Sequence, residues 1–103
     1  MHNLVYLIGR LVEDPKIKKE DEKEVCNIII ACTRQFKNED GIYDIDYINI
    51  RLENGIATNT CDYCKKGDLL GIKGRLEVNE NSYIVVAERI TFLASANKSS
   101  GEE

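Results

Sequence analysis

Four cysteines and one histidine are the side chains of this 103-residue chain best suited to metal binding or thiol redox chemistry. Cys61 and Cys64 have the C-x-x-C spacing of redox and zinc sites, but a zinc ribbon requires a second such pair. Cys26 and Cys32 are instead separated by five residues within an apolar segment, and His2 lies at the start of the chain. The pattern favours structural thiols over redox chemistry and predicts no metal site and no cofactor.

The sequence also lacks the motifs that many enzyme classes require. It contains no paired carboxylates at motif spacing, no nucleophile elbow and no phosphate-binding loop. The single histidine lies at an N-terminus that is expected to fray. We therefore predict no catalytic residue and expect a binding protein rather than an enzyme.

Residues 47–53 show the clearest alternation of apolar and polar side chains. Ile48, Ile50 and Leu52 are expected to face a core. The opposite, wet side carries Tyr47, Asn49, Arg51 and Glu53. One face of this predicted strand therefore presents an aromatic ring and a cation to solvent.

The other predicted elements precede and follow this strand along the chain. Further strands are expected at residues 3–12, 25–33, 69–78 and 83–93, with a bulge or tight bend at Gly9. A short helix should begin at an Asn54 cap and be closed by Gly67. Three strands, a helix and two strands follow the order of the oligonucleotide/oligosaccharide-binding (OB) fold. The predicted fold is thus an all-β, five-stranded OB-fold barrel with one short helix between strands 3 and 4.

Length and composition are consistent with a single domain. The expected boundaries are residues 1–94 for the OB-fold domain and 95–103 for a disordered polar tail. The net charge of −4 comes largely from residues 20–24 and 39–46, both expected to be solvated turns. The sequence shows no signal peptide and no run near the ~20 apolar residues of a membrane helix. These features predict a cytoplasmic protein with no membrane partner.

Several segments resemble bacterial single-stranded DNA-binding proteins. They are NLVYLIGRLVEDP at 3–15, RQFKN at 34–38, DYIN at 46–49, YCKKGD at 63–68, GIKGRL at 71–76 and ITFL at 90–93. These segments occur in order and span nearly all of the chain that is expected to be ordered. The resemblance implies a homo-oligomer, usually a tetramer, that binds single-stranded DNA without reading its sequence, in DNA replication, recombination or repair.

Binding of this kind requires rings on which bases stack and cations along the phosphates. By resemblance, Phe36 and Tyr47 are the stacking residues. The other candidate nucleic-acid-binding residues are Arg10, Arg34, Lys37, Asn49, Arg51, Lys73 and Arg75. Other roles stay open: an interface or surface tyrosine for Tyr47, a loop anchor for Phe36, and simple solubility for each cation.

Departures from the family pattern predict weaker or more salt-sensitive binding. Glu53 replaces a second aromatic, Leu4 replaces a basic residue, and the hairpin between strands 4 and 5 is cut to residues 79–81. Replication proteins stay candidate partners, although the usual acidic tail tip is missing. The alternative is an OB-fold protein-interaction subunit, such as a primosomal or conjugation accessory protein, with weak nucleic-acid affinity.

The first strand is apolar on both sides. Val5 and Leu7 fall on one side, and Leu4, Tyr6 and Ile8 fall on the other. A strand of this kind needs two apolar partners, a core and something else. We therefore expect a symmetric contact between two copies of the chain through this strand, and the choice between dimer and tetramer stays open.

Overall fold

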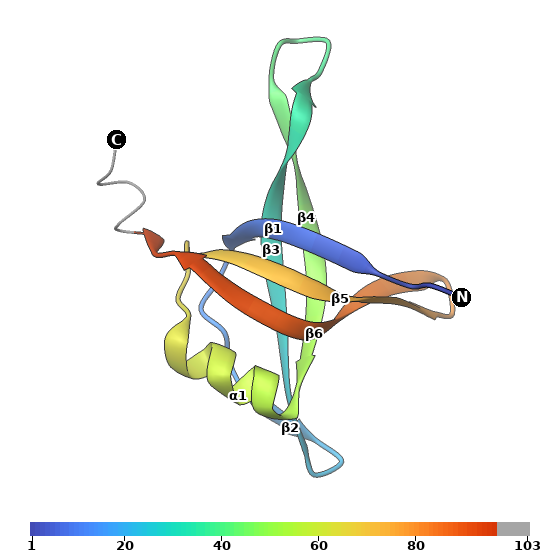
Figure 1. The fold of residues 1–103 in the computed structure, drawn as a ribbon, viewed down its shortest axis with the longest axis vertical. Coiled ribbons are helices and arrows are strands. Elements are labelled where there is room, and N and C mark those ends of the chain that lie inside the picture. The colour runs from blue at the N-terminus through green and yellow to red at the C-terminus, as the bar shows by residue number, and fades with distance from the viewer. Residues whose placement is uncertain (97–103) are drawn as a thin grey trace.

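The computed structural model describes residues 1–96, and the rest of the predicted tail lies outside the described residues. The described part contains six strands and one helix (Figure 1). In chain order they are β1 (Val5–Leu11), β2 (Lys18–Glu20), β3 (Lys23–Lys37), β4 (Tyr43–Glu53), α1 (Asn54–Tyr63), β5 (Leu69–Asn79) and β6 (Ser82–Ala94).

Five of these strands close into a barrel, which confirms the predicted fold. The antiparallel pairs are β1 with β5, β5 with β6, and β3 with β4. Two short contacts complete the ring: a parallel one between β4 and β6, and an antiparallel one between β1 and β3. Helix α1 follows the third barrel strand, as predicted, and β2 is an extra short strand that pairs with β3.

Aliphatic side chains fill the barrel because every second residue of each strand points inward. Ile30, Ile50, Leu52, Leu70 and Ile72 have no exposed surface. Burial of one such side chain contributes about 1.5–3 kcal/mol. The predicted inward face of the 47–53 segment is confirmed. Ile50 and Leu52 belong to the core, and Ile48 packs against it.

β1 approaches β3 closely at Gly9, beside the residues through which the two strands pair. A Cβ atom at Gly9 would lie 2.6 Å from the carbonyl oxygen of Ala31 and 2.9 Å from Sγ of Cys32. The next two residues of β1, Arg10 and Leu11, are the ones that pair with β3. The predicted bend therefore depends on glycine because any side chain would separate the two strands.

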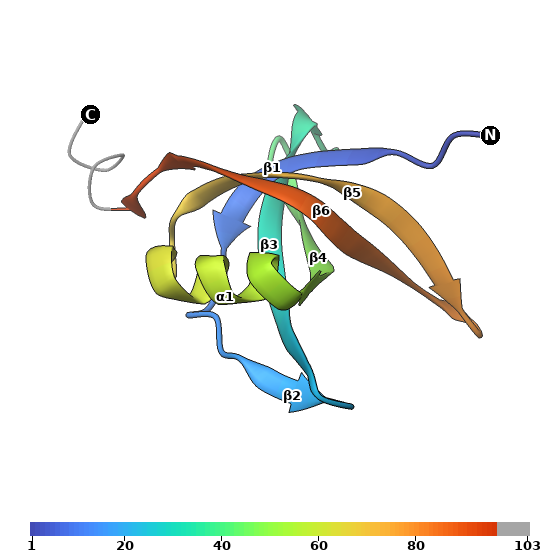
Figure 2. The same ribbon diagram turned by 60° about the horizontal axis from the view of Figure 1, so that its bottom comes forward.

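Hairpins extend from the barrel in different directions. The β3–β4 hairpin projects at the top of Figure 1, and the β5–β6 hairpin projects to the side. In the second view (Figure 2), helix α1 lies below β6 and above β2, and it packs against β3, β4 and β6. The start of the chain follows the β5–β6 hairpin, where the Asn3 amide makes two 2.8 Å hydrogen bonds with the backbone of Leu76.

The β3–β4 hairpin is longer than the sequence predicted. Residues 34–37, which lie beyond the strand predicted at 25–33, belong to β3, and β4 begins at Tyr43, within the solvated turn predicted at 39–46. The register is irregular between Thr33 and Lys37, which interrupts the alternation that reveals a strand. At the tip, Asn38 Oδ1 accepts hydrogen bonds from the backbone N–H groups of Asp40 and Ile42.

The ends of α1 also differ from the prediction. Glu53 occupies the N-cap position without a side-chain capping bond, and Asn54 has a φ of 57°. The helix ends at Tyr63, before Gly67, whose backbone N–H donates to the carbonyl of Leu11 at 2.7 Å. Gly67 therefore shapes the loop before β5 and does not close the helix. Within residues 1–96, the structure contains no helix long and apolar enough to cross a membrane.

Candidate nucleic-acid interface

All seven aromatic side chains of the chain are exposed. The core is aliphatic, so the rings stay at the surface. Of the two predicted stacking residues, Phe36 is the most exposed of the seven at 82%, and Tyr47 is 64% exposed. Both lie on the β3–β4 hairpin (Figure 1), where bases could reach them.

Tyr47 belongs to a row of outward-facing residues that crosses three strands. Its partner on β3 is Ala31, whose partner on β1 is Arg10. Paired residues share a face of the sheet, so Tyr47 and Arg10 flank the small Ala31 side chain, about 10 Å apart across two strand spacings. Arg10 Nη1 donates a 3.0 Å hydrogen bond to the carbonyl oxygen of Gly67. A predicted ring and a predicted cation are thus brought to one surface.

A second ring and cation meet near the tip of the same hairpin. Lys37 pairs with Tyr43, and its Nζ atom lies 5.7 Å from the centroid of the Tyr43 ring. That distance allows a cation–π contact. Tyr43 lies four residues before Tyr47 on β4 and shares its face. The sequence did not single out Tyr43, which lies beyond the segment with the clearest alternation.

Arg34 lies on the other face of the hairpin. Its guanidinium donates to both carboxylate oxygens of Asp46 at 2.9–3.2 Å and lies 3.9 Å from Asp44. Asp46 and Tyr47 are consecutive in β4 and point to opposite sides. The bonds from Arg34 lower the pKa of Asp46. Arg34 is therefore separated from Tyr47, although the sequence grouped them in one candidate site.

A groove of about 450 Å³ adjoins the row that contains Tyr47. Its lining from β3 and β4 includes Asn27, Asn49 and Arg51. The β5–β6 hairpin supplies the opposite wall, which includes the 68% exposed ring of Tyr83. Two predicted residues, Asn49 and Arg51, thus meet an aromatic that the prediction missed. The shortened turn at residues 79–81 suggested that this hairpin had lost its ring, whereas Tyr83 lies two residues after that turn on β6.

Two carboxylates hold Arg51 at this groove. Arg51 Nε donates to Glu53 at 2.8 Å, and Nη2 donates to Glu20 at 3.0 Å. Glu20 also lies 3.4 Å from Nζ of Lys18. The bonds from Arg51 lower the pKa values of both glutamates. The prediction that residues 20–24 form a simple solvated turn is wrong for Glu20, and Glu24 accepts a hydrogen bond from Thr58.

The remaining two candidate cations lie on β5. Arg75 donates to Glu77 at 2.7 Å and lies 3.4 Å from Glu88, so it too is held by two carboxylates. Lys73 lies in a row between Tyr6 of β1 and Arg89 of β6, away from the β3–β4 hairpin. The structure therefore does not gather all the predicted cations around Tyr47.

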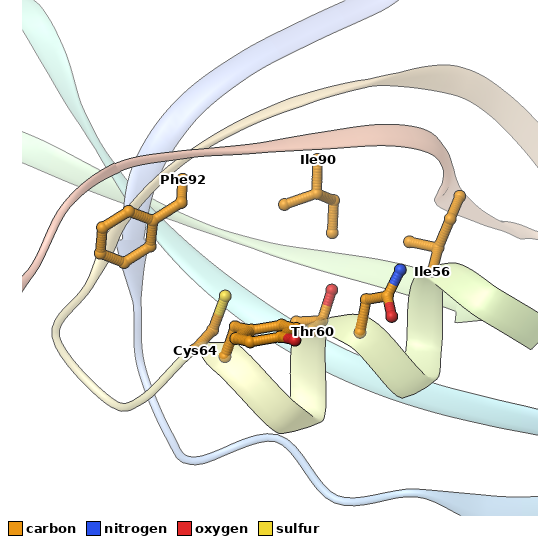
Figure 3. Close-up of a pocket in the computed structure, with 7 residues that line it drawn as sticks. Ile56, Thr60, Cys64, Ile90 and Phe92 are labelled. Carbon is orange, nitrogen blue, oxygen red and sulfur yellow. The ribbon is translucent and has the colours of Figure 1, made fainter.

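A second hollow, of about 290 Å³, lies between α1 and β6 (Figure 3). Ile56, Thr60 and Cys64 of the α1 side face Ile90 and Phe92 of β6. One side of the helix therefore lines this mostly apolar hollow. It has no cationic lining of its own, and none of its lining residues belongs to β3 or β4.

The four cysteines are all free thiols. Cys61 contacts Cys26 of β3, with the two Sγ atoms 3.8 Å apart. The pKa of Cys61 is raised to about 12, mainly by burial and to a smaller extent by the neighbouring Cys26. No group of three or more His, Cys, Asp or Glu side chains placed to hold a metal occurs within residues 1–96.

This barrel geometry is accompanied by clear sequence relationships. The model of the single-strand binding protein family matches residues 2–92. The chain belongs to the single-strand binding protein family. It is 37% identical over 103 aligned positions to single-stranded DNA-binding protein B of Bacillus subtilis, with 90% of this chain and 91% of that protein covered.

Other members of the single-strand binding protein family show the same extent of similarity. Single-stranded DNA-binding protein 1 of Clostridium acetobutylicum is 35% identical, covering 88% of this chain and 93% of the relative. A crystal structure of a deletion mutant of the single-stranded DNA-binding protein from Thermus aquaticus superposes with a TM-score of 0.71 at 27% identity. That match covers 89% of this chain and 50% of the Thermus chain.

Proposed function

We propose that this protein binds single-stranded DNA without sequence specificity, as a binding protein rather than an enzyme. Its place would be in DNA replication, recombination or repair in the cytoplasm. The observation that carries the proposal is the exposed Tyr47 ring, which shares an outward row with Arg10 and adjoins a groove containing Tyr83. Membership of the single-strand binding protein family supports the same function.

Base stacking is the dominant interaction in this proposal. A base on an exposed aromatic ring contributes about 1–3 kcal/mol without regard to its identity, because every base has a π-face. Tyr43 extends the aromatic track toward the hairpin tip, with Lys37 beside it for phosphates. Phe36 is a further exposed ring on β3 of the same hairpin. The amides of Asn27 and Asn49 can hydrogen-bond any base edge in the groove.

A fluorescence-anisotropy titration with labelled oligothymidine, at two salt concentrations, tests this function. We expect salt-dependent binding that duplex DNA of the same length does not reproduce. Tyr47→Leu should weaken binding by about 5- to 150-fold, which corresponds to one lost stacking contact. Tyr63→Leu is the matched control, because Tyr63 is 75% exposed but lines the hollow beside α1. Equal effects of the two substitutions, or no binding at tens of micromolar, would exclude this interface.

We also propose that two copies of the chain associate through β1. Val5 and Leu7 pack against the core, whereas Leu4, Tyr6 and Ile8 are 50–66% exposed on the outer side. Between Val5 and Ile8, the described pairing of β1 is with β5, which leaves its other edge available. An exposed apolar strand with a free edge is a template for pairing with another chain. A symmetric β1–β1 contact would bury both features.

Sedimentation at micromolar concentration tests this assembly. We expect an oligomer for the wild type and a shift toward monomer for Tyr6→Arg, which places a charge on the outer side of β1. Lys19→Glu on β2 is a control with a charge change away from β1. A monomeric wild type would contradict the assembly without affecting the proposal for DNA binding.

A further inference from the structure

The contacts of Arg51 have a direct consequence for binding at the groove. The guanidinium uses one edge, formed by Nε and Nη2, to bond Glu53 and Glu20. The same kind of edge can make a two-bond contact with a phosphate, because phosphate and carboxylate oxygens match its geometry alike. In the free protein, this edge is already occupied by anions of the chain itself.

The two carboxylates come from different elements. Glu53 ends β4, the strand that carries Arg51, whereas Glu20 ends β2 and reaches Arg51 from the hairpin on the other side of β3. Lys18 adds a second cation beside Glu20, and Lys23 and Arg75 act electrostatically on Glu53. The side chain of Arg51 is 27% exposed, so the cluster borders solvent at the groove.

We propose that Glu20 and Glu53 occupy the position of a DNA phosphate on Arg51, so that DNA must displace them to use the groove. The inference rests on the proposed single-stranded DNA binding. Ion pairs at a surface are weak, and a phosphate can therefore compete with them. The two glutamates lower the affinity of the groove without blocking it.

Replacement of both glutamates by neutral isosteres tests the competition. E20Q/E53Q should bind labelled oligothymidine about three- to tenfold more tightly than the wild type. Its affinity should also depend more steeply on salt. In this variant, Arg51 can bind a phosphate without first breaking an ion pair with a carboxylate. One such phosphate contact adds about 0.7 to the magnitude of the slope of log K against log salt.

The control has the same change in net charge on the same β2–β3 hairpin. D21N/E22Q removes two exposed carboxylates at the turn, where Asp21 and Glu22 have positive φ angles. If the competition operates, this control should tighten binding less than E20Q/E53Q and leave the salt slope unchanged. If both variants tighten binding equally, the effect is one of net charge and the proposal is overturned. Weaker binding by E20Q/E53Q than by the wild type would also overturn it.

An Arg51→Gln background provides the decisive comparison. In this background, E20Q/E53Q should no longer bind oligothymidine more tightly than D21N/E22Q, because the cation that the two substitutions release is absent. An advantage that persists without Arg51 would contradict the mechanism. Circular dichroism checks folding, and E53Q against E22Q carries the same comparison if the double variant does not fold. If neither the wild type nor any variant binds oligothymidine, the proposed function is excluded as well. If the proteins bind but E20Q/E53Q and D21N/E22Q have equal effects, only the proposed competition is excluded.

Discussion

Arg34 and Tyr47 lie on opposite faces of the β3–β4 hairpin, because Arg34 is bound to Asp46, the residue before Tyr47. The hairpin therefore has an aromatic face and a salt-bridged face. On the aromatic face, Tyr43 and Tyr47 are accompanied by Lys37. This arrangement separates Lys37, which lies beside the Tyr43 ring, from Arg34, which two carboxylates hold on the other face.

The division predicts different roles for Lys37 and Arg34. Lys37→Gln should weaken oligothymidine binding and reduce the salt slope by about 0.7, the value for one phosphate contact on a single strand. Arg34→Gln should leave the slope unchanged, since its guanidinium is already paired with Asp44 and Asp46. Anisotropy titrations over several salt concentrations measure both slopes. A larger loss of slope for Arg34→Gln would show that DNA follows the other face.

Tyr83 should act as a stacking residue in the groove. Tyr83→Leu removes the ring and should weaken binding by about 5- to 150-fold, whereas Tyr83→Phe keeps it and should preserve the affinity. The comparison separates stacking from hydrogen bonding by the hydroxyl group. Loss of affinity in Tyr83→Phe would assign the contribution to the hydroxyl, and unchanged affinity in Tyr83→Leu would place DNA outside the groove.

The barrel could be predicted from the sequence because the core-lining parts of its strands show a clear apolar pattern and are separated by turn residues. Alternation placed Tyr47 and Arg51 on the outer face, and Gly9 marked the closure. The contact partners could not be predicted in this way, because Glu20 and Arg51 are 31 residues apart in the sequence. The same limit applies to Glu53: the departure from the family pattern was visible, but its bond to Arg51 required the structure. Tyr83 was missed because the length of the turn, rather than the residues of the strand that follows it, guided the prediction.

Gly9→Ala should destabilise the barrel at its closure. The new Cβ atom would lie 2.6 Å from the Ala31 carbonyl oxygen, which the backbone can relieve only by moving β1 from β3. We expect the free energy of unfolding to fall by about 1–3 kcal/mol, as for other overpacked sites. Urea denaturation measures this change. Gly55→Ala is the control, because Gly55 lies in α1 with no atom near its Cβ position and should gain about 0.5–1 kcal/mol. Similar losses in both variants would contradict the role of close approach.

Cys61 should make stability depend on pH in the alkaline range. Burial raises its pKa from the ordinary 9.0 to about 12, so the folded state retains the thiol proton more strongly than the unfolded chain. The stabilising contribution is therefore complete below pH 9 and is lost as pH rises toward 12. Urea denaturation at pH 8 and pH 10.5 should show a steeper decline in the free energy of unfolding for the wild type than for Cys61→Ala, which lacks this thiol. Identical declines would mean that the thiol ionises as readily in the folded protein as in the unfolded chain, and that the contact with Cys26 leaves it open to water.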